Sequence, residues 1–337
     1  MKTSLLSARL GELGWAAVFA DQVAVDEQHL TPARIVGVHR TKLAMISVHG
    51  ATEIGLGEDE TTAQFAVGDW VLLDIAEAKL VRRLERTSLL QRRIEGQAEA
   101  QLAAANVDTL FIVTSCNADF NPARLERYLT IANDAGIRPV ILLTKADLVA
   151  DTQAYVDEAR SLQRDLSVLA LDARSSDTTA VLSPWCGTGV TVALTGSSGV
   201  GKSTLVNALS LGAGQVTGDI REHDAKGRHT TTARSLHEMT GGGWIVDNPG
   251  MRNLHVSHVA EGIETTFAEI IELAADCKFR DCTHIREPGC AVQAAIQAGA
   301  LSELRVNRWR KLSDENQKST PQQTGPRGNK RNARVKY

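Results

Sequence analysis

In the first part of the chain, apolar residues come in short runs that polar residues and turn signals interrupt. Runs of this kind are typical of a small β-barrel. The strands are expected at residues 34–39, 43–49, 64–67 and 70–75. We therefore predict a barrel of OB type over residues 33–88, although a barrel of SH3 type fits the same pattern. Residues 1–32 read as an N-terminal extension with one short helix at residues 10–19.

The middle of the chain alternates near-continuous apolar runs with amphipathic stretches. The apolar runs lie at residues 109–115, 139–144, 168–171 and 191–195. Such runs are expected of strands that are buried on both faces of a parallel sheet. Because amphipathic stretches at residues 122–135 and 152–165 lie between them, the pattern predicts a doubly wound α/β domain over residues 100–255.

Past residue 255 the pattern becomes helical around a group of cysteines. We expect helices at residues 263–275 and 291–298, within a helical domain over residues 256–315. Residues 316–337 are poor in apolar side chains, basic, and rich in Pro, Gly, Asn and Gln. A segment of that composition cannot bury a core, so it is expected to be a disordered tail.

The composition is that of an ordinary globular protein. Of the 337 residues, 43% are hydrophobic and 23% are charged, which is the usual range. The formal net charge of −3 argues against a protein that coats a polyanion with its whole surface. No apolar run reaches the roughly 20 residues that span a bilayer, and residues 1–20 lack the apolar stretch of a signal peptide. We expect a cytoplasmic protein.

A phosphate-binding loop follows the run at residues 191–195. Residues 196–203 read Gly-Ser-Ser-Gly-Val-Gly-Lys-Ser, which fits G-x-x-x-x-G-K-[ST] at each fixed position, and a helix is expected at residues 203–211. The backbone N–H groups of such a loop surround phosphates at the positive end of a helix. Lys202 would reach the β- and γ-phosphates, and Ser203 would place its hydroxyl on Mg²⁺.

A second phosphate motif lies further along. An apolar run at residues 244–246 ends in Asp247-Asn248-Pro249-Gly250. Asp247 would hold Mg²⁺ through water, and the Gly250 N–H can contact a γ-phosphate. The polar sequence Gly-Arg-His-Thr-Thr-Thr at residues 227–232 reads as a switch loop, in which Thr231 is our candidate to complete the Mg²⁺ shell. An ordinary surface loop would also account for it.

Thr144-Lys145-Ala146-Asp147 closes an expected strand and resembles the guanine motif Asn-Lys-x-Asp, with Thr in place of Asn. The Asp147 carboxylate can accept hydrogen bonds from guanine N1–H and the 2-amino group, which adenine does not offer. Lys145 would lay its aliphatic stem along the purine. A chance match of four residues remains an alternative. Residues 171–174 are a weaker candidate for a second base contact.

The base motif precedes the phosphate loop, whereas the usual GTPase has the opposite order. The strands needed for the sheet are all present, so we predict a circularly permuted P-loop GTPase domain. Met251 stands where Ras-like GTPases have a Gln that orients the attacking water. We therefore assign His229 of the expected switch loop to that role. Contact of His229 with RNA or solvent, and a water-orienting group supplied by the partner, stay open.

The spacing Cys277-x₄-Cys282-x-His284-x₅-Cys290 places three thiolates and one imidazole within a short segment. Three sulfurs and one nitrogen make a closed tetrahedral Zn²⁺ set without an open position, so we interpret the site as structural. Three free buried thiols are the alternative.

Two groups of basic residues suggest contacts with the phosphate backbone of RNA, although solvated faces explain each group as well. The first group is Arg82, Arg83, Arg86, Arg92 and Arg93. The second is Arg305, Arg308, Arg310 and Lys311, with further Lys and Arg in the tail.

In their order, these motifs resemble the RsgA (YjeQ) family of bacterial circularly permuted GTPases, over about residues 33–312. The resemblance implies late maturation of the small ribosomal subunit, with hydrolysis of GTP to GDP and phosphate that the subunit stimulates. It implies an OB-fold domain and a zinc domain that touch ribosomal RNA, one structural Zn²⁺, and Mg²⁺ with GTP. It gives the zinc ligands as Cys277, Cys282, His284 and Cys290. It gives the nucleotide contacts as Thr144, Lys145, Ala146, Asp147, Gly196, Ser197, Ser198, Gly199, Val200, Gly201, Lys202, Ser203 and Thr204.

Two other functions fit parts of the sequence. One is a nucleotide-gated RNA-binding module with negligible turnover, and the other is a P-loop phosphatase or kinase that acts on a small metabolite. We expect a monomer whose partners are the small ribosomal subunit, its RNA and the nucleotide, without a membrane partner. Asn248, where members of the family commonly have Thr, is a mild departure that leaves Asp247 and Gly250 intact.

Overall fold

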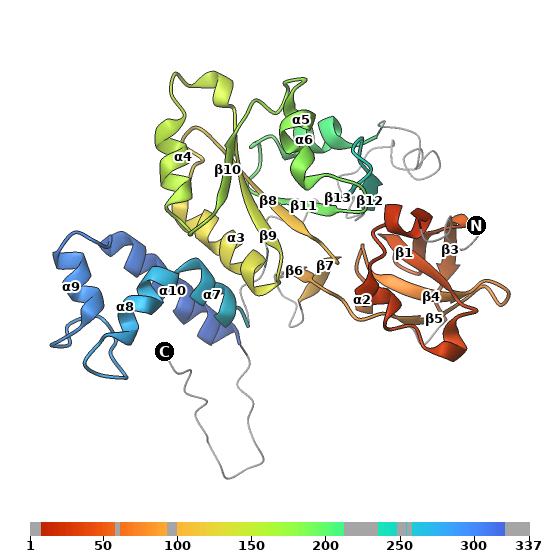
Figure 1. Ribbon diagram of the computed structural model, residues 1–337, viewed down its shortest axis with the longest axis horizontal. Coiled ribbons are helices and arrows are strands. Elements are labelled where there is room, and N and C mark those ends of the chain that lie inside the picture. Colours follow the sequence, from red (N-terminus) through yellow and green to blue (C-terminus); the bar gives the residue numbers. More distant parts are fainter. Residues whose placement is uncertain are drawn as a thin grey trace, which may run out of the picture.

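The computed structural model describes residues 8–57, 61–92, 100–211, 235–247, 254 and 258–320. An N-terminal barrel, a central α/β unit and a group of C-terminal helices lie next to one another (Figure 1). None of the described helices is both long and apolar enough to cross a lipid bilayer.

The barrel contains more strands than the sequence pattern predicts. Its strands are β1 Thr31–Val38, β2 Lys42–Ser47, β3 Gly50–Gly55, β4 Trp70–Asp74 and β5 Lys79–Arg83. β1 pairs antiparallel with both β2 and β4, and β4 pairs with β5. The side chains that fill the interior are Ala33, Ile35, Leu43, Met45, Phe65, Val71 and Leu73. β3 and β5 were not predicted because β3 is largely exposed, β5 is only partly buried, and neither has a continuous apolar face.

The predicted strand at residues 64–67 is wrong. The chain there forms a short 3₁₀ helix, η2 Thr62–Gln64, and then turns. The turn is held by the Asp69 carboxylate, which accepts a hydrogen bond from Ala66 N at 2.8 Å. Gly68 has a φ of +94°, and a Cβ at this position would meet Ala105 O at 2.1 Å. Although residues 64–67 are mostly apolar, the close packing of Gly68 against Ala105 requires a turn here instead of a strand.

The single helix predicted at residues 10–19 is also interrupted. Residues 8–12 are helical, and α2 Ala17–Ala20 begins after a break. At the break Gly14 has a φ of +89° and packs so closely that a Cβ would meet Gly189 O at 2.7 Å. The segment is fixed to the rest of the protein, because Trp244 Nε1 donates to Glu12 O at 2.8 Å. A 3₁₀ turn, η1 Val25–Glu27, leads into the barrel.

Arg34 joins the barrel to the central unit from inside the protein. It is 1% exposed and donates to Leu13 O at 2.7 Å and to Thr191 Oγ1 at 2.6 Å. Its guanidinium also lies 3.5 Å from Asn106 O. Burial lowers the pKa of Arg34 to about 10. The N-terminal segment, the barrel and the central sheet thus meet at one buried cation.

The central sheet has the parallel order that the sequence pattern predicts. Its strands are β8 Thr109–Ser115, β9 Arg138–Thr144, β10 Ser167–Ala170, β11 Thr191–Thr195 and β13 Trp244–Asp247. They lie in the order β10-β9-β8-β11-β13, with each neighbouring pair parallel. The antiparallel strand β12 Ser235–Glu238 lies between β13 and β1 and makes the barrel and the central sheet one continuous sheet. β6 Leu89–Arg92 and β7 Gln101–Ala105 form a separate pair.

Helices cover both faces of the central sheet (Figure 1). α3 Pro122–Asp134 and α4 Gln153–Arg160 lie on one face, and α5 Thr178–Leu182 and α6 Lys202–Leu209 lie on the other. Successive β8 residues belong to different cores, since Leu110 and Ile112 pack with α3 whereas Phe111 and Val113 pack with α6. Burial on both faces explains the continuous apolar run of β8, and the predicted α/β class is confirmed.

The C-terminal helices are α7 Ala260–Thr266, α8 Ala268–Ala275, α9 Ala291–Gln297 and α10 Glu303–Ser319. The helix predicted at residues 263–275 breaks at Phe267, and α10 runs through residues 316–319, which the sequence pattern assigned to the tail. Residues 321–337 lie outside the described residues. α7 lies directly on α3, because a Cβ at Gly262 would meet Thr130 O at 2.0 Å.

A buried ion-pair network ties α10 to the central unit. Arg305 donates to Glu126 Oε1 at 2.7 Å and to Glu269 Oε1 at 2.8 Å, and also to the carbonyls of Leu162 and Thr266. The second oxygen of Glu126 accepts from Arg308 at 2.7 Å. The Glu126 side chain is 0% exposed. The C-terminal helices are therefore anchored on α3 rather than attached by a loose linker.

Candidate nucleotide and metal sites

The order of the parallel strands reverses between β8 and β11. From β8 the chain adds β9 and then β10 on one side, whereas β11 and β13 lie on the other side. Open α/β sheets bind ligands at the carboxyl ends of the strands, at such a point of reversal. Here the end of β11 leads into Gly196, and the end of β9 leads into Lys145. Two of the predicted motifs therefore share one edge of the sheet.

The predicted phosphate-loop residues occupy the turn after β11 and the first turn of α6. These residues are Gly196, Ser197, Ser198, Gly199, Val200, Gly201, Lys202, Ser203 and Thr204. Only glycine fits the first position, because Gly196 has a φ of +138° and a Cβ would meet Val113 O at 2.0 Å. Lys202 Nζ donates to Gly196 O at 2.8 Å and to Ser197 O. The ammonium thus lies across the loop, where anionic phosphates would meet it.

Ser203 and Asp247 lie at the same edge. Ser203 is exposed in the first turn of α6. In the parallel pair of β11 and β13, Val246 lies opposite Ala193. Asp247 follows one residue later, level with the end of β11. A hydroxyl and a carboxylate are ligands that suit Mg²⁺. Gly250, His229, Thr231, Asn248 and Met251 lie outside the described residues.

Thr144 supports the phosphate loop from behind. Its side chain is completely buried, and Oγ1 lies 2.6 Å from Val200 O and 3.1 Å from Thr114 O. A hydroxyl has one proton, and the shorter contact is the one to the phosphate loop. Thr144 therefore links the end of β9 to the loop, which the sequence alone did not indicate.

The two segments predicted to contact the base are neighbours. Asp147 lies in the short 3₁₀ helix η3 Ala146–Leu148, and Ala146 N donates to Leu171 O at 3.4 Å. Lys145 has a φ of +57°, which turns the chain at this point. The Asp147 carboxylate is 31% exposed and accepts a hydrogen bond from Arg174 Nη2 at 3.0 Å. An accessible carboxylate is thus held in place next to the phosphate loop.

The cysteines and the histidine of the C-terminal unit converge. The ligand atoms of Cys277, Cys282, His284 and Cys290 all lie within 4.8 Å of one another. His284 Nδ1 lies 3.5 Å from the sulfurs of both Cys277 and Cys290, and the two sulfurs are 3.9 Å apart. This donor set could hold a metal ion and fits tetrahedral Zn²⁺.

The surroundings of this cluster disfavour charged side chains. Burial raises the pKa of the Cys282 thiol to about 12 and lowers the pKa of His284. Thiols that bind a metal ion lose their protons to it, and the neutral imidazole of His284 is already in the form that binds a metal. Glu287 does not join the donor set: its carboxylate accepts hydrogen bonds from Thr283 N at 2.9 Å and Ile285 N at 3.0 Å, which shapes the loop. The Thr283 side chain is the main cause of the lowered pKa of Glu287.

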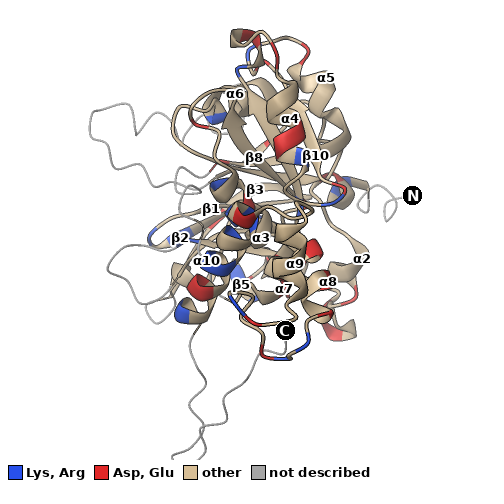
Figure 2. Ribbon diagram, turned by 90° about the vertical axis from the view of Figure 1, so that its left-hand side faces the viewer, with Lys and Arg blue, Asp and Glu red and all other residues tan. Residues whose placement is uncertain are grey.

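Four of the basic residues singled out in the sequence have acidic partners within the described part of the protein. Arg82 pairs with Glu27 at 2.6 Å, and Arg86 pairs with the buried Asp69 at 2.6 Å. Arg305 and Arg308 both form ion pairs with Glu126. Figure 2 shows basic and acidic segments interspersed over the C-terminal helices. Each of these four arginines thus has an acidic partner that the sequence alone did not indicate, and their contact with RNA phosphates stays a prediction. Arg93 lies outside the described residues.

Comparisons with known proteins agree with this arrangement. A family model described as RsgA GTPase matches residues 83–257. The small ribosomal subunit biogenesis GTPase RsgA of Mesorhizobium japonicum is 60% identical over 327 residues, which cover 96% of this chain and 94% of that protein. The small ribosomal subunit biogenesis GTPase RsgA 2 of Vibrio vulnificus is 47% identical over 315 residues, 93% of this chain and 89% of its own.

Two solved structures have the same fold. The crystal structure of YloQ, a circularly permuted GTPase, is 26% identical and has a TM-score of 0.60, with coverage of 89% of this chain and 99% of YloQ. YjeQ from Thermotoga maritima is 23% identical, also with a TM-score of 0.60, over 85% of this chain and 98% of YjeQ. The circular permutation expected from the motif order is therefore confirmed.

Proposed function

This chain belongs to the RsgA GTPase family, and from that premise we propose that it binds the small ribosomal subunit and acts in its late maturation. Like its family, it hydrolyses GTP to GDP and phosphate. The observation that carries the proposal is the placement of the phosphate loop, Asp247 and the segment around Asp147 at one edge of a circularly permuted sheet. Its site of action is then the cytoplasm, where the subunit matures, and it acts as a monomer.

Different residues at this edge bind the phosphates, the Mg²⁺ ion and the base of the nucleotide. The N–H groups of the loop and the Lys202 ammonium bind the phosphates. Ser203, Asp247 and Thr231 would hold Mg²⁺, which neutralises charge on the β- and γ-phosphate oxygens. The Asp147 carboxylate reads guanine through N1–H and the 2-amino group. Thr144 keeps the loop and the base segment in a fixed relation through its contact with Val200 O.

Orientation of the attacking water falls to a residue outside the described part of the chain. Met251 stands where a Gln would act in Ras-like GTPases and cannot hydrogen-bond to water. We propose His229 for this role, because an imidazole can accept or donate a hydrogen bond to water. Hydrolysis by the free protein is then slow until the subunit brings His229 into position at the attacking water.

The loops around the Cys/His cluster offer the surface that suits ribosomal RNA. Phe279 and Ile285 are 41% and 56% exposed there. Three cations, Lys278, Arg280 and Arg286, lie beside them without an ion-pair partner in the described part of the chain. Cations bind phosphates, and an exposed aromatic ring can stack on an unpaired base. One Zn²⁺ on Cys277, Cys282, His284 and Cys290 would hold these loops in shape.

The decisive experiment compares GTP hydrolysis by the purified protein alone, with small ribosomal subunits and with large ribosomal subunits. We expect a slow rate alone and a clear rise with small subunits only. ATP in place of GTP serves as the control for base specificity. Equal rates in all three mixtures would overturn the assignment to the small subunit. Negligible rates in all three mixtures would favour a nucleotide-gated binding module.

A further inference from the structure

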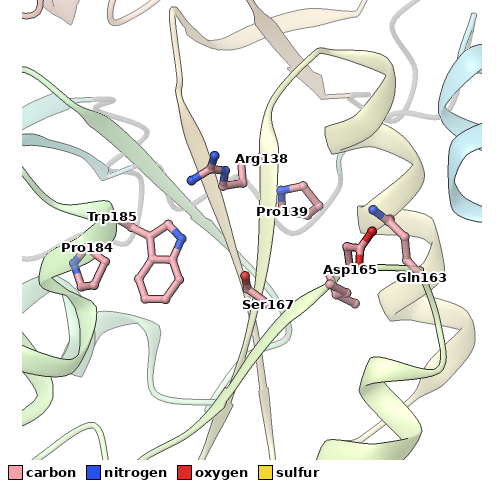
Figure 3. A pocket seen from close by; sticks show the side chains of 8 residues that line it. Arg138, Pro139, Gln163, Asp165, Ser167, Pro184 and Trp185 are labelled. Atoms are coloured by element: carbon pink, nitrogen blue, oxygen red, sulfur yellow. The ribbon is translucent and has the colours of Figure 1, made fainter.

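A cavity of about 350 Å³ lies at the edge of the central sheet opposite the phosphate loop (Figure 3). It opens at the amino ends of two strands, where Arg138 begins β9 and Ser167 begins β10. Arg138 and Thr144 are the first and last of the seven residues of β9, so they lie roughly 20 Å apart along the strand. The cavity is therefore distinct from the nucleotide edge.

The walls of the cavity combine an aromatic ring with a cation. Trp185 comes from the 3₁₀ turn η4 Ser183–Trp185 and is half-buried against the core under α6. Figure 3 shows the Arg138 guanidinium on the side of the strand on which the Trp185 ring lies, with Ser167 below it. Gln163 and Asp165 form the other end of the cavity. All five residues line this one cavity.

The polar groups of Arg138 and Trp185 do not stabilise the fold through hydrogen bonds or ion pairs among the described residues. Within the described ranges, neither the Arg138 guanidinium nor the Trp185 indole N–H has a hydrogen-bond or ion-pair partner. Arg34, Arg86 and Arg305 by contrast each donate to protein oxygens. Gln163 uses its carbonyl oxygen to accept from Asn133 at 2.8 Å, so its amide N–H groups remain available. A planar ligand with an anionic group would satisfy this set.

We propose that the cavity holds one unstacked nucleotide of RNA, with its base against Trp185 and its phosphate at Arg138. The volume lies at the small end of the range of about 300–1,000 Å³ for ligand pockets, which suits one nucleotide and excludes a helix. Proteins commonly read single-stranded RNA by stacking bases on aromatic rings beside a cation. Asp165, the anionic group at the far end, repels a second phosphate and can accept a hydrogen bond from the base or the ribose.

This inference rests on the proposed function to the extent that the ribosomal subunit supplies the RNA. It adds a contact made by the GTPase unit itself, apart from the barrel and the Cys/His cluster. Because the cavity and the phosphate loop lie at opposite edges of the central sheet, RNA and nucleotide can be bound together.

Binding of a single-stranded adenosine hexanucleotide of RNA tests the proposal. The full-length protein is kept saturated with GDP and Mg²⁺, so that the phosphate loop is filled, and fluorescence anisotropy of labelled RNA gives the affinity. We expect Trp185→Ala to weaken binding about tenfold or more, since base–aromatic stacking is worth about 1–3 kcal/mol. Trp185→Phe should retain most of the affinity but lose the quenching of tryptophan fluorescence.

Salt dependence tests the phosphate contact separately. Arg138→Gln should weaken binding and reduce the slope of log affinity against log salt by about 0.7, the value for one phosphate contact with a single strand. Arg160→Gln is the matched control, because Arg160 is exposed on α4 and has no ion-pair partner among the described residues. It should change neither quantity. The GDP affinity of every variant should equal that of the wild type.

Equal RNA binding by the wild type and Trp185→Ala, or an unchanged salt slope in Arg138→Gln, would overturn the nucleotide assignment. Cosedimentation with small subunits separates this result from the proposed function. If the wild type and both variants bind the subunit and are stimulated alike, the proposed function stands and the cavity is not an RNA site. If Trp185→Ala weakens subunit binding but the wild type does not bind the hexanucleotide, the cavity takes a protein group, and the proposal fails.

Discussion

Two residues of the expected base motif, Thr144 and Asp147, differ in burial and in the groups that they contact. Thr144 occupies the position of Asn in the guanine motif Asn-Lys-x-Asp. Its hydroxyl is buried and donates to the carbonyl of Val200. Asp147, three residues later, is accessible and paired with Arg174. One residue of the motif is thus buried against the loop and the other is accessible, so the two call for different experiments.

Asp147→Asn should change the base that the site prefers. The substitution turns one acceptor of the carboxylate into an amide donor, which suits xanthine better than guanine. We expect GTP affinity to fall by about ten- to a hundredfold, in line with about 1.5–3 kcal/mol for a hydrogen bond to a charged group, and use of XTP to improve. Nucleotide titrations measure both, with Asp151→Asn as the control at an exposed carboxylate nearby. Unchanged GTP affinity would remove Asp147 from the site.

Thr144→Val should weaken nucleotide binding indirectly, through the phosphate loop that Thr144 contacts. It keeps the shape of the side chain but leaves the Val200 carbonyl without its 2.6 Å contact. An unsatisfied buried group costs about 1–3 kcal/mol, so we expect a lower melting temperature and a lower GDP affinity. Thr144→Ser keeps the hydroxyl and should behave like the wild type. A stable Thr144→Val protein with normal affinity would show that the contact is not needed.

His229→Ala tests the assignment of the water-orienting residue. Binding of GTP and of the subunit should persist, because neither depends on this imidazole in our proposal. Most of the subunit-stimulated rate should be lost, since the positioning of an acid–base group contributes about 10²–10⁴-fold. Single-turnover hydrolysis with subunits in excess is the measurement. A near-normal stimulated rate would point to the ribosomal partner as the source of the group.

Among the elements, burial decided what the sequence could predict. The bounds of β8 and β11 agree with their apolar runs, because both faces of these strands are covered. β3 and β12 carry few buried side chains and were missed. The predicted sites divide in the same way: local motifs indicated the phosphate loop and the Cys/His cluster, and the ligand atoms of the cluster lie together. The partners of Arg305, by contrast, come from helices far apart in the chain and leave no local pattern.

Glu126→Gln should loosen the attachment of α10 to α3. The carboxylate is completely buried and neutralises both Arg305 and Arg308. Removing one partner of a buried ion pair costs about 3–5 kcal/mol, and we expect the melting temperature to fall accordingly. Glu315→Gln is the matched control, because it removes a partly exposed ion pair with Arg127 that is worth at most about 1 kcal/mol. Equal effects of the two changes would contradict a special role for the buried network.

The Cys/His cluster should contain one Zn²⁺ per chain by metal analysis. Cys282→Ser should lower the stability of the C-terminal helices while the free protein still binds nucleotide, because metal binding and local folding are coupled. Limited proteolysis locates the loosened region, and GDP titration checks the nucleotide edge. A wild-type protein that is folded and free of metal would contradict the zinc site.

For the whole molecule, the order of the motifs indicated the permutation, but the way in which the parts are joined was not visible in the sequence. β12 pairs with β13 on one side and with β1 on the other, and so unites two units that the apolar pattern treats as separate. The N-terminal segment, read as an extension, packs against the loop before β11 and against Trp244. Pairings of this kind depend on the finished three-dimensional arrangement.

The buried position of Arg34 has a consequence for the synthesis of the chain. The barrel strand that carries Arg34 leaves the ribosome early, but the Thr191 hydroxyl that the guanidinium binds is made much later. At about 5–20 residues per second, the wait is roughly 8–30 s. Until then the cation has to stay in water, so the barrel cannot close fully against its neighbours. The first unit to be translated therefore completes its folding only after the central sheet has followed it out.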